Sequence, residues 1–416
     1  MGQQSAVISA SRRSSEKAKS APRPIRLNID VPLLLVTITL VVMGILMLYS
    51  ASWDISFLST ETHSLTYMLT RQLMWLGLGL VGMVAMAWLN YHSWQHLAVW
   101  SMLAAIVALI VVLLFGDGTR SWSGGSYQPS ELAKFVIVIY LAVWLYAKKD
   151  QLGDANFGLF PLAAILGIVG GLIFSQPDLS AAATVIILGG IMFYLAGGDL
   201  RQITILLIVA ILVGLLVVAV NPTGSNRVDS FLAGLKNPLE SSDHVQRSLS
   251  AFARGGWFGV GIGRGTTKLT SLPVPHTDSI FAVVGEELGV VGASVIACLF
   301  GLLLWRGLLI ARRAPDGLGS LMAAGLTIWI TMEAAMNMLA LIGLMPFAGN
   351  TLPFFSVGGS SLVFSLAAVG IVLNISRLSE QEQETQRRTF SALIDLRGRD
   401  RRRRVSRARR ARTSKR

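Results

Sequence analysis

The sequence predicts an all-α, polytopic membrane protein with about ten transmembrane helices and a large extracytoplasmic loop between helices 7 and 8. Of its 416 residues, 53% are hydrophobic and only 14% are charged, which far exceeds the apolar content that one soluble core needs. Ten stretches with few or no charges each have close to the roughly 20 residues that cross a bilayer. They cover residues 31–51, 72–89, 97–115, 132–147, 157–174, 179–196, 202–220, 280–304, 318–345 and 357–375.

The distribution of Lys and Arg predicts the orientation of these spans. Six of the 36 Lys and Arg residues precede residue 29, and fifteen follow the last predicted span. Because cytoplasmic segments of membrane proteins carry an excess of Lys and Arg, both termini are expected inside, which an even number of spans allows. Residues 1–28 lack the apolar core of a cleavable signal peptide.

Three regions follow from this organisation. They are a basic, disordered cytoplasmic N-terminal tail (1–28), a membrane domain (29–377) that includes the outer loop (221–279), and a basic cytoplasmic C-terminal tail (378–416). The run Arg401–Arg404 alone would suit nucleic acid. Next to a span, however, it favours a solvated, disordered tail or one that contacts anionic membrane lipid or a cytoplasmic partner, so no nucleic-acid partner is expected.

The outer loop ends in a Pro-rich turn that brings Asp278 to the start of a predicted span. Loops of this length in a compact bundle are usually functional. Two interpretations stay open for the carboxylate: Thr277 or Asp278 caps the following helix, or Asp278 is a functional group. Earlier in the loop, alternating glycines at 255–265 surround Trp257 and Phe258, a pattern that predicts a reentrant or interfacial segment.

Two further spans also begin with ionisable residues. Glu131 and Lys134, three residues apart, share one helix face and are expected to pair. A surface ion pair is the simple interpretation, but ionisable groups inside spans usually face a protein cavity. Ser130 is the expected cap of this helix. Asp178 begins another span, where an N-cap is the favoured interpretation.

Under the predicted topology, six polar residues lie at the outer ends of spans. These are Arg71, Glu131, Lys134, Asp178, Asp278 and Ser360. Their grouping predicts one outward-facing cavity of mixed charge, reached by a substrate from the outer leaflet. The single cysteine, Cys298, permits no intrachain disulfide and makes a cysteine-based metal site improbable.

Several motifs resemble those of the SEDS family (shape, elongation, division, sporulation) of bacterial cell-wall polymerases, which includes FtsW and RodA. The resemblance covers about residues 31–377. The matching motifs are Gln128-Pro-Ser-Glu-Leu-Ala-Lys134, Gln176-Pro-Asp-Leu179, Gly261-Ile-Gly-Arg-Gly265 with Lys268, Leu272-Pro273 with His276-Thr-Asp278, Glu286-Glu-Leu-Gly289, Leu352-Pro-Phe354 and Gly358-Gly-Ser-Ser361.

This resemblance implies an inverting peptidoglycan glycosyltransferase in the bacterial cytoplasmic membrane. Such an enzyme polymerises lipid II into β-1,4 glycan strands on the outer face, with undecaprenyl-pyrophosphate-linked glycan as donor. The implied partners are a class B penicillin-binding protein and other divisome proteins. The basic tails and Glu286-Glu-Leu-Gly289 favour the FtsW-like division branch, located at the septum, over the RodA-like elongation branch.

The resemblance also implies roles for individual residues. Asp278 matches the family's proposed catalytic aspartate, Glu131 and Lys134 match its cavity pair, and Asp178 and Ser360 match positions that support the cavity. Substrate contacts are expected from Arg71, Lys268 and His276, in addition to Glu131 and Lys134.

The implied reaction needs a base and a cation. A carboxylate, here Asp278, would take the proton of the acceptor's 4-hydroxyl. Lys134, Arg71 or a divalent cation such as Mg or Mn would offset the charge on the leaving pyrophosphate. No metal triad is visible in the sequence, so any such cation would be held by Asp278, Glu131 and the substrate's phosphates.

Two other classes of function remain as alternatives. A lipid II flippase would also have an outward cavity, but the two halves of the chain show no repeat and the polar residues gather on one side. A noncatalytic scaffold would leave the outer carboxylates unexplained. Three places depart from the family's usual pattern, namely Val274, Ser180-Ala181 and Val357, and all three leave the catalytic candidates intact.

Overall fold

The computed structural model describes residues 29–59, 66–115, 128–176, 178–220, 222–270, 272–347 and 349–413. Within these ranges it describes the side chains of all residues except 53–59, 216–220, 222–223, 270 and 387–413. The described chain is helical and contains no strand, so the predicted all-α class is confirmed. The predicted N-terminal tail, residues 1–28, lies outside the described residues.

The α-helices follow one another in this order: α2 Val31–Ser59, α3 Tyr67–Trp88, α4 Trp94–Phe115, α5 Pro129–Lys148, α6 Leu159–Ser175, α7 Leu179–Leu195, α8 Leu200–Val220, α9 Pro222–Lys236, α10 Asp243–Gly255, α11 Thr267–Thr270, α12 Ile280–Arg313, α13 Gly317–Leu341 and α14 Gly359–Thr413. Three short 3₁₀ helices are η1 Tyr91–Ser93, η2 Lys149–Gln151 and η3 Pro238–Glu240.

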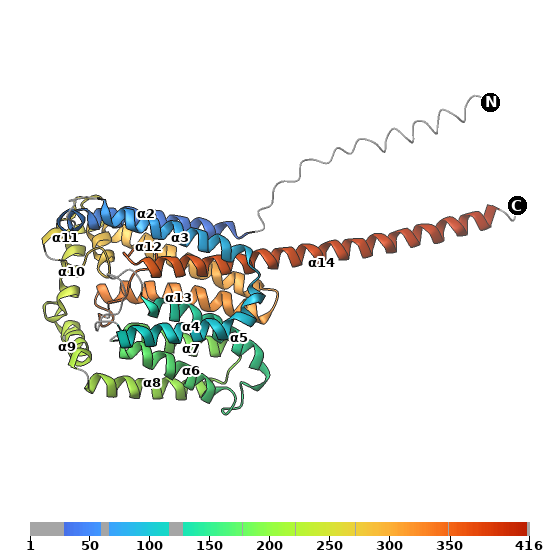
Figure 1. Ribbon diagram of the computed structural model, residues 1–416. Helices are drawn as coiled ribbons and strands as arrows, with labels where there is room; N and C mark the ends of the chain where they lie inside the picture. The colour runs from blue at the N-terminus through green and yellow to red at the C-terminus, as the bar shows by residue number, and fades with distance from the viewer. Residues whose placement is uncertain are drawn as a thin grey trace, which may run out of the picture.

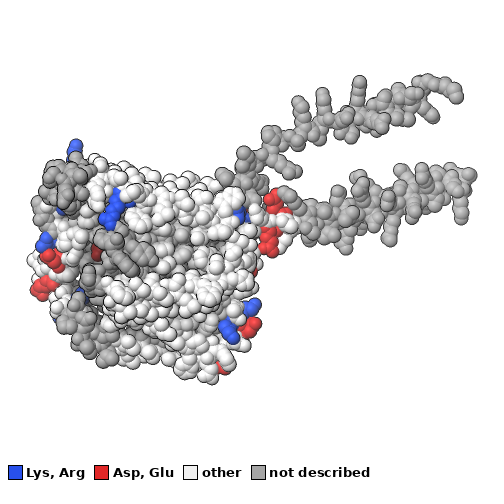
Figure 2. Space-filling model, viewed as in Figure 1, with Lys and Arg blue, Asp and Glu red and all other residues white. Residues whose placement is uncertain are grey.

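Most of these helices lie side by side in one bundle, and α9, α10 and α11 lie across one end of it (Figure 1). We call this end the outer end, because the charge pattern predicts that it is extracytoplasmic, and we call the opposite end the inner end. Helix α2 begins, and α14 leaves the bundle, at the inner end (Figure 1). On the face shown in Figure 2, charged residues gather at the two ends and leave an uncharged flank between them, as a bilayer requires.

Seven helices of the described chain are long and apolar enough to cross a membrane, namely α2, α3, α4 with η1, α5 with η2, α12, α13 and the first part of α14. Three further apolar helices, α6, α7 and the described part of α8, are shorter. A 17-residue helix is only about 26 Å long, slightly less than the roughly 30 Å hydrocarbon layer. The predicted number of ten spans therefore stays a prediction.

Helix α14 extends beyond the last predicted span, and the predicted C-terminal tail stays a prediction. Helix α14 runs without a break from Gly359 to Thr413, across the predicted boundary at residue 377. Residues 378–413 contain no proline, and more than half of them are Arg, Glu, Gln or Ala, all strong helix formers. High local propensity can therefore extend the helix beyond the bundle, where no packing is needed to select it (Figure 1).

The core of the bundle is built around α13, whose apolar window is 78% buried. It packs against α5, α7, α12 and α14. Helices α3 and α14 approach closely because glycines face the partner backbone. A Cβ atom on Gly370 of α14 would lie 2.4 Å from the carbonyl oxygen of Met83 on α3. This close approach brings the outer end of α3 to the connection that precedes α14.

Helix α12 is interrupted near its outer end. Gly289 has φ 70° and ψ −173°, a backbone conformation that only glycine adopts without strain. The interruption removes helical partners from nearby peptide groups, and the glycine-rich segment at 256–261 replaces them. Its backbone forms four hydrogen bonds with α12: Val260 N to Glu286 O, Gly261 N to Glu287 O, Val290 N to Gly256 O and Val291 N to Trp257 O.

These hydrogen bonds show what the alternating glycines do. The glycine-rich segment was predicted to be reentrant or interfacial, and the structure packs its backbone directly against the kink of α12. A Cβ atom on Gly259 would lie 2.2 Å from the carbonyl oxygen of Glu287, so only glycine permits the contact. Trp257 and Phe258 are 71% and 84% exposed, which suits the predicted headgroup level.

Candidate functional site

The outer end of α5 carries a buried ion pair. Pro129 occupies the first helical turn, where its missing N–H is not needed, and Gln128 is the N-cap residue rather than Ser130 as predicted. Lys134 Nζ lies 2.8 Å from Glu131 Oε1, which confirms the expected pairing. The two residues are only 5% and 4% exposed, so the pair is not a weak surface contact.

A third residue, Glu333 of α13, completes this central cluster. Its Oε1 atom also accepts a hydrogen bond from Lys134 Nζ, so the ammonium lies between two carboxylates. Oε2 of Glu131 and Oε2 of Glu333 are buried and have no hydrogen-bond partner within the described part of the chain. Glu333 was not among the predicted site residues, although it is the only charged residue between 317 and 341 and intramembrane carboxylates are usually functional.

Asp178 caps α7 and also ties α7 to α5. Its Oδ1 accepts from Ala181 N, which confirms the N-cap interpretation. Its Oδ2 accepts from Gln128 Nε2 at 2.9 Å and from Ser130 Oγ at 3.2 Å. Ser130 makes this contact instead of capping the helix, because α5 begins at Pro129 and its N-cap is Gln128, two residues before Ser130.

Ser360, at the start of α14, contacts the same segment. Its Oγ accepts from Gln128 N at 3.2 Å. Asp178 and Ser360 therefore both hold the segment that begins α5, and their implied role in supporting the cavity stays a prediction. The position of the Glu131–Lys134 pair depends on these contacts.

Asp278 lies in a backbone segment that three hydrogen bonds hold in place. His276 O accepts from Val357 N at 2.9 Å, and Thr277 O accepts from Ser356 Oγ at 2.7 Å. Asp278 O accepts from Asn337 Nδ2, also at 2.9 Å. Three consecutive carbonyls are thus anchored by the 352–357 connection and by α13. We call this arrangement the carbonyl clamp.

Helix α13 connects the carbonyl clamp to the central cluster. Glu333 and Asn337 are four residues apart, so they lie on one face of α13 about 6 Å apart along its axis. Glu333 contacts Lys134, and Asn337 contacts the backbone of Asp278. The two groups of candidate residues, from distant parts of the sequence, therefore lie about one helical turn apart.

Ser279 occupies the N-cap position of α12, and Asp278 is half-buried one residue before it. The interpretation that Thr277 or Asp278 caps the helix is therefore wrong. The carboxylate is displaced from the helix terminus because the preceding turn extends to Ser279.

His276 belongs to this segment, and His244 lies beside its end at Ser279. Burial lowers the pKa of His276, and the Nδ1 atom of His276 is buried without a hydrogen-bond partner among the described residues. His244 of α10 places Nδ1 3.3 Å from Ser279 Oγ and stacks on Phe347 with ring centroids 4.2 Å apart. Burial is also the main cause of the lowered pKa of His244.

Arg71 lies near the outer end of α3. It lines an open groove of about 500 Å³ together with aromatic and apolar side chains, including Tyr67, Trp75 and Leu78. The neighbouring Gln72 is buried and donates to Ser356 O at 3.3 Å. Through Ser356, the outer end of α3 contacts the same connection that holds Thr277.

Lys268 is placed in a separate buried cluster against the kink of α12. Its Nζ lies 2.5 Å from Glu287 Oε1 and 2.7 Å from Ser50 Oγ. The side chains of Lys268 and Glu287 are 2% and 0% exposed. The predicted substrate contact of Lys268 stays a prediction, and these contacts favour a structural role.

Glu286 supports the same region. Its carboxylate accepts from the backbone N–H groups of Thr266 and Thr267 at 3.0 and 3.1 Å. The Glu286-Glu287 pair therefore joins α12 to the segment that leads to α11. Neither glutamate reaches the Glu131–Lys134 pair in the contacts of the described chain.

A divalent cation held by Asp278, Glu131 and the substrate's phosphates stays a prediction. In the part of the chain that the structure describes, no three His, Cys, Asp or Glu residues converge as metal ligands. The Lys134 ammonium already lies between the carboxylates of Glu131 and Glu333. Lys134 is therefore the cation whose position the described residues define.

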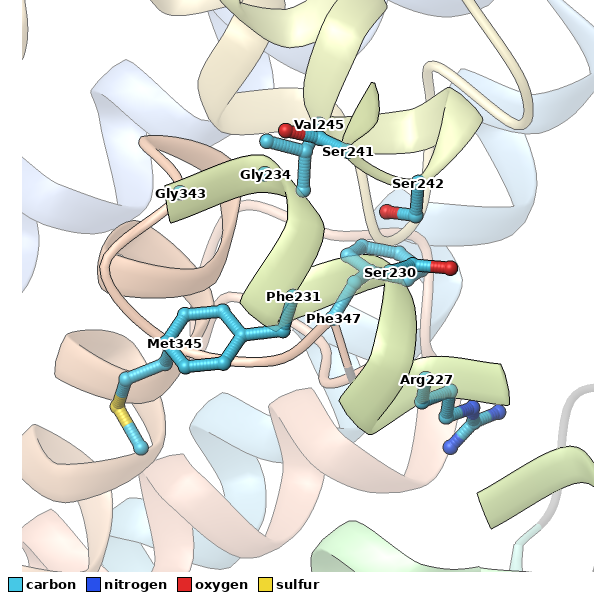
Figure 3. Close-up of a pocket in the computed structure, with 10 residues that line it drawn as sticks. All are labelled: Arg227, Ser230, Phe231, Gly234, Ser241, Ser242, Val245, Gly343, Met345 and Phe347. Carbon is cyan, nitrogen blue, oxygen red and sulfur yellow. The ribbon is translucent and has the colours of Figure 1, made fainter. Parts of the chain in front are cut away.

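A small cavity lies beside His244, between α9, α10 and the connection after α13 (Figure 3). Arg227, Phe231, Val245 and Phe347 are among its lining residues. Its volume of about 10 Å³ has room for about one water molecule. This cavity is therefore too small for a saccharide and marks a packing defect between the outer helices.

The fold and the buried polar clusters define a polytopic helical membrane protein with a charged site at the outer end of its bundle. A family model described as "Cell cycle protein", which covers FtsW, RodA and SpoVE, matches residues 31–381. The chain belongs to this family.

Relatives from several bacteria bear names of the same family. The chain is 35% identical over 355 residues to a probable peptidoglycan glycosyltransferase FtsW from Geobacter sp. (strain M18), covering 83% of this chain and 96% of the relative. It is 37% identical over 363 residues to the protein of the same name from Trichlorobacter lovleyi, with 85% and 95% covered. It is 35% identical over 370 residues to stage V sporulation protein E from Bacillus subtilis, with 84% and 97% covered.

Two solved structures share the fold. One is a chain from a peptidoglycan synthase complex described as coordinating polymerization and crosslinking, with TM-score 0.69 and 28% identity over 85% of this chain and 99% of that one. The other is the rod shape determining protein RodA from Thermus thermophilus, with TM-score 0.61 and 28% identity over 85% and 98%.

Proposed function

We propose that this protein is an inverting peptidoglycan glycosyltransferase that polymerises lipid II at the outer face of the cytoplasmic membrane. Family membership supports the class of reaction. The observation that carries the assignment of the site is the alignment along α13, where Glu333 and Asn337 link the Lys134 ammonium to the backbone of Asp278. Glu333 and Asn337 are about one helical turn apart on α13, so one helix contacts both the proposed cation and the residue that carries the proposed base, the two kinds of charge that glycosyl transfer needs.

In the proposed mechanism, Asp278 is the general base. Its carboxylate takes the proton of the acceptor's 4-hydroxyl as the oxygen attacks the anomeric carbon of the donor. The new β-1,4 bond forms as the bond from that carbon to the pyrophosphate oxygen breaks, with inversion. The carbonyl clamp contributes by fixing the Asp278 backbone, so that little orientational freedom is lost in the transition state.

Lys134 is the proposed cation that stabilises the leaving pyrophosphate. Glu131 and Glu333 hold its ammonium in place. Their unpartnered Oε2 atoms are hydrogen-bond acceptors, the complement of sugar hydroxyl donors. Arg71 lines a membrane-facing groove with apolar side chains, which suits a phosphate attached to a polyprenyl chain. His276 is the remaining proposed substrate contact.

The partner and the location belong to the same proposal. We propose a class B penicillin-binding protein as the partner, because a similar fold occurs in a peptidoglycan synthase complex. Relatives named FtsW support a place in the division machinery with other divisome proteins, at the septum and with both termini in the cytoplasm.

The test is lipid II polymerisation by the purified protein with its penicillin-binding partner. The isosteric substitution Asp278→Asn should reduce polymerisation at least about 100-fold, because general-base catalysis contributes 10²–10⁴-fold. Asp243→Asn is the matched control, since Asp243 is an exposed carboxylate on α10 that pairs only at the surface with Arg247. Both variants should keep the wild-type melting temperature.

Full polymerisation by Asp278→Asn would refute the assignment of the base. Loss of activity in both variants would show a general effect of charge at the outer end. A third outcome would favour the flippase alternative over the polymerase. In it, the wild-type protein makes no polymer but scrambles lipid II between the leaflets of liposomes, and Asp278→Asn scrambles lipid II equally well.

A further inference from the structure

A second cavity lies at the inner end of the bundle, far along the helices from Asp278. Its volume is about 480 Å³, and its lining residues come from the inner ends of α5, α7, α12 and α13. Cavities of this size accommodate a small ligand or a lipid headgroup. None of the residues assigned to the candidate functional site lines it.

The cavity has an apolar part and a cationic part. Leu195, Leu308 and Leu321 contribute aliphatic wall from three different helices. Lys149 and Arg312 line the same cavity, and both are exposed at the inner end. Two cations beside an aliphatic wall between transmembrane helices match the chemistry of an anionic lipid, with its phosphate in the headgroup layer and its chains along the wall.

The one carboxylate in the lining does not neutralise these cations. Asp316 caps α13 by accepting from Gly319 N at 2.8 Å. It also accepts from Tyr91 Oη at 2.9 Å and lies 2.8 Å from His92 Nε2. Its oxygens are therefore already engaged by three groups outside the cationic part of the cavity.

Lys149 and Arg312 differ from Arg306, another basic residue of the inner end. Arg306, two turns earlier on α12, forms an ion pair with Asp30 at 2.6 Å. In the described ranges, neither Lys149 nor Arg312 forms an ion pair with an acidic residue. Lys149 instead lies over the Tyr146 ring, with Nζ 6.0 Å from the ring centroid. Both charges can therefore be directed to a ligand.

We propose that this cavity binds an anionic phospholipid, with the phosphate between Lys149 and Arg312 and an acyl chain along Leu195, Leu308 and Leu321. The bound lipid joins the inner ends of α5, α7, α12 and α13. Because α13 also holds Glu333 and Asn337, the lipid stabilises the helix on which the outer site depends. The charge pattern assigns this lipid to the cytoplasmic leaflet, whereas the proposed lipid II substrate approaches from the outer one.

The proposal is tested on the full chain in detergent by native mass spectrometry with added dioleoylphosphatidylglycerol or dioleoylphosphatidylcholine. Lys149→Gln with Arg312→Gln should weaken phosphatidylglycerol binding about 25-fold, since each cation near the surface contributes roughly a factor of five. Lys148→Gln with Arg313→Gln is the matched control. It removes the same charge from adjacent residues that do not line the cavity, and should retain binding.

Three outcomes would overturn the proposal. Equal loss in the two double variants would show diffuse electrostatic attraction rather than a site. Unchanged phosphatidylglycerol binding by Lys149→Gln with Arg312→Gln would show that these two cations do not hold the lipid. Competition by soluble glycerol phosphate at the same concentration as the lipid would show a free-phosphate site without a role for the apolar wall. Monodisperse elution and an unchanged melting temperature without added lipid exclude misfolding of either double variant.

Discussion

At the scale of single residues, the carbonyl clamp explains how a half-buried aspartate can be positioned without being a helix cap. All three hydrogen bonds are accepted by backbone carbonyl oxygens, those of His276, Thr277 and Asp278. The backbone is therefore fixed without the side chain acting as the N-cap, a position that Ser279 occupies. A cap would instead have committed an oxygen to the N–H groups of α12.

A substitution of Lys268 can distinguish a structural role of this residue from a contact with the substrate. Lys268→Met would leave the fully buried Glu287 without its cation, which should lower the free energy of unfolding by about 3–5 kcal/mol. Thermal unfolding in detergent without substrate measures this loss. The double substitution Lys268→Met with Glu287→Met should recover much of it. An unchanged melting temperature together with a raised KM for lipid II would restore the predicted substrate contact.

Two histidines predict a dependence of stability on pH. Burial lowers the pKa of both His244 and His276 in the folded protein, so the unfolded chain binds protons first as the pH falls. Their contribution to stability is complete above the unfolded pKa of about 6.5 and decreases below it.

Melting temperatures between pH 7.5 and 5.5 should therefore fall more steeply for the wild type than for His244→Gln. The exposed His96 provides the control, and His96→Gln should keep the wild-type slope. Equal slopes for all three proteins would show that His244 does not couple α10 to the folded state through its protonation.

At the scale of elements, the kink of α12 is a junction between a membrane helix and the outer loop. Peptide groups released at Gly289 bond to the backbone of the glycine-rich segment. Just after this segment, Gly263 N donates to Glu287 Oε2 at 3.0 Å. Side-chain and backbone contacts thus hold together a segment that has no regular secondary structure.

Gly289→Ala should destabilise the protein by about 1–3 kcal/mol, since a Cβ atom strains the positive φ and would lie 2.4 Å from Gly259 N. Gly301→Ala is the control in the same helix. Its Cβ would meet nothing within 4 Å and should be neutral or stabilising by up to about 1 kcal/mol. Similar melting temperatures for the two variants would contradict the proposed strain.

At the scale of the whole molecule, the short helices α6, α7 and α8 decide the number of crossings. If all three cross the membrane, the connections between them alternate between its two sides. We expect this alternation because Asp150 and Asp199 lie at the inner ends of the helices, whereas Ser175 and Glu240 lie toward the outer end.

Single cysteines introduced at these four positions in a Cys298→Ser background test the expectation with a membrane-impermeant maleimide. In intact cells, Ser175→Cys and Glu240→Cys should be labelled, and Asp150→Cys and Asp199→Cys should react only after permeabilisation. Glu380→Cys, on α14 beyond the bundle, should behave like the inner pair. Labelling of Asp199→Cys in intact cells would reduce the number of spans.

The sequence by itself determined the membrane class, the approximate helix limits and the Glu131–Lys134 pair, because apolar length and helical spacing act over short distances along the chain. The tertiary structure alone decided which distant residues meet. It placed Glu333 and Asn337 beside the two predicted groups, and it moved Lys268 into a buried pair with Glu287. Such contacts depend on the packing of α13 and on the kink at Gly289, and neither follows from local spacing.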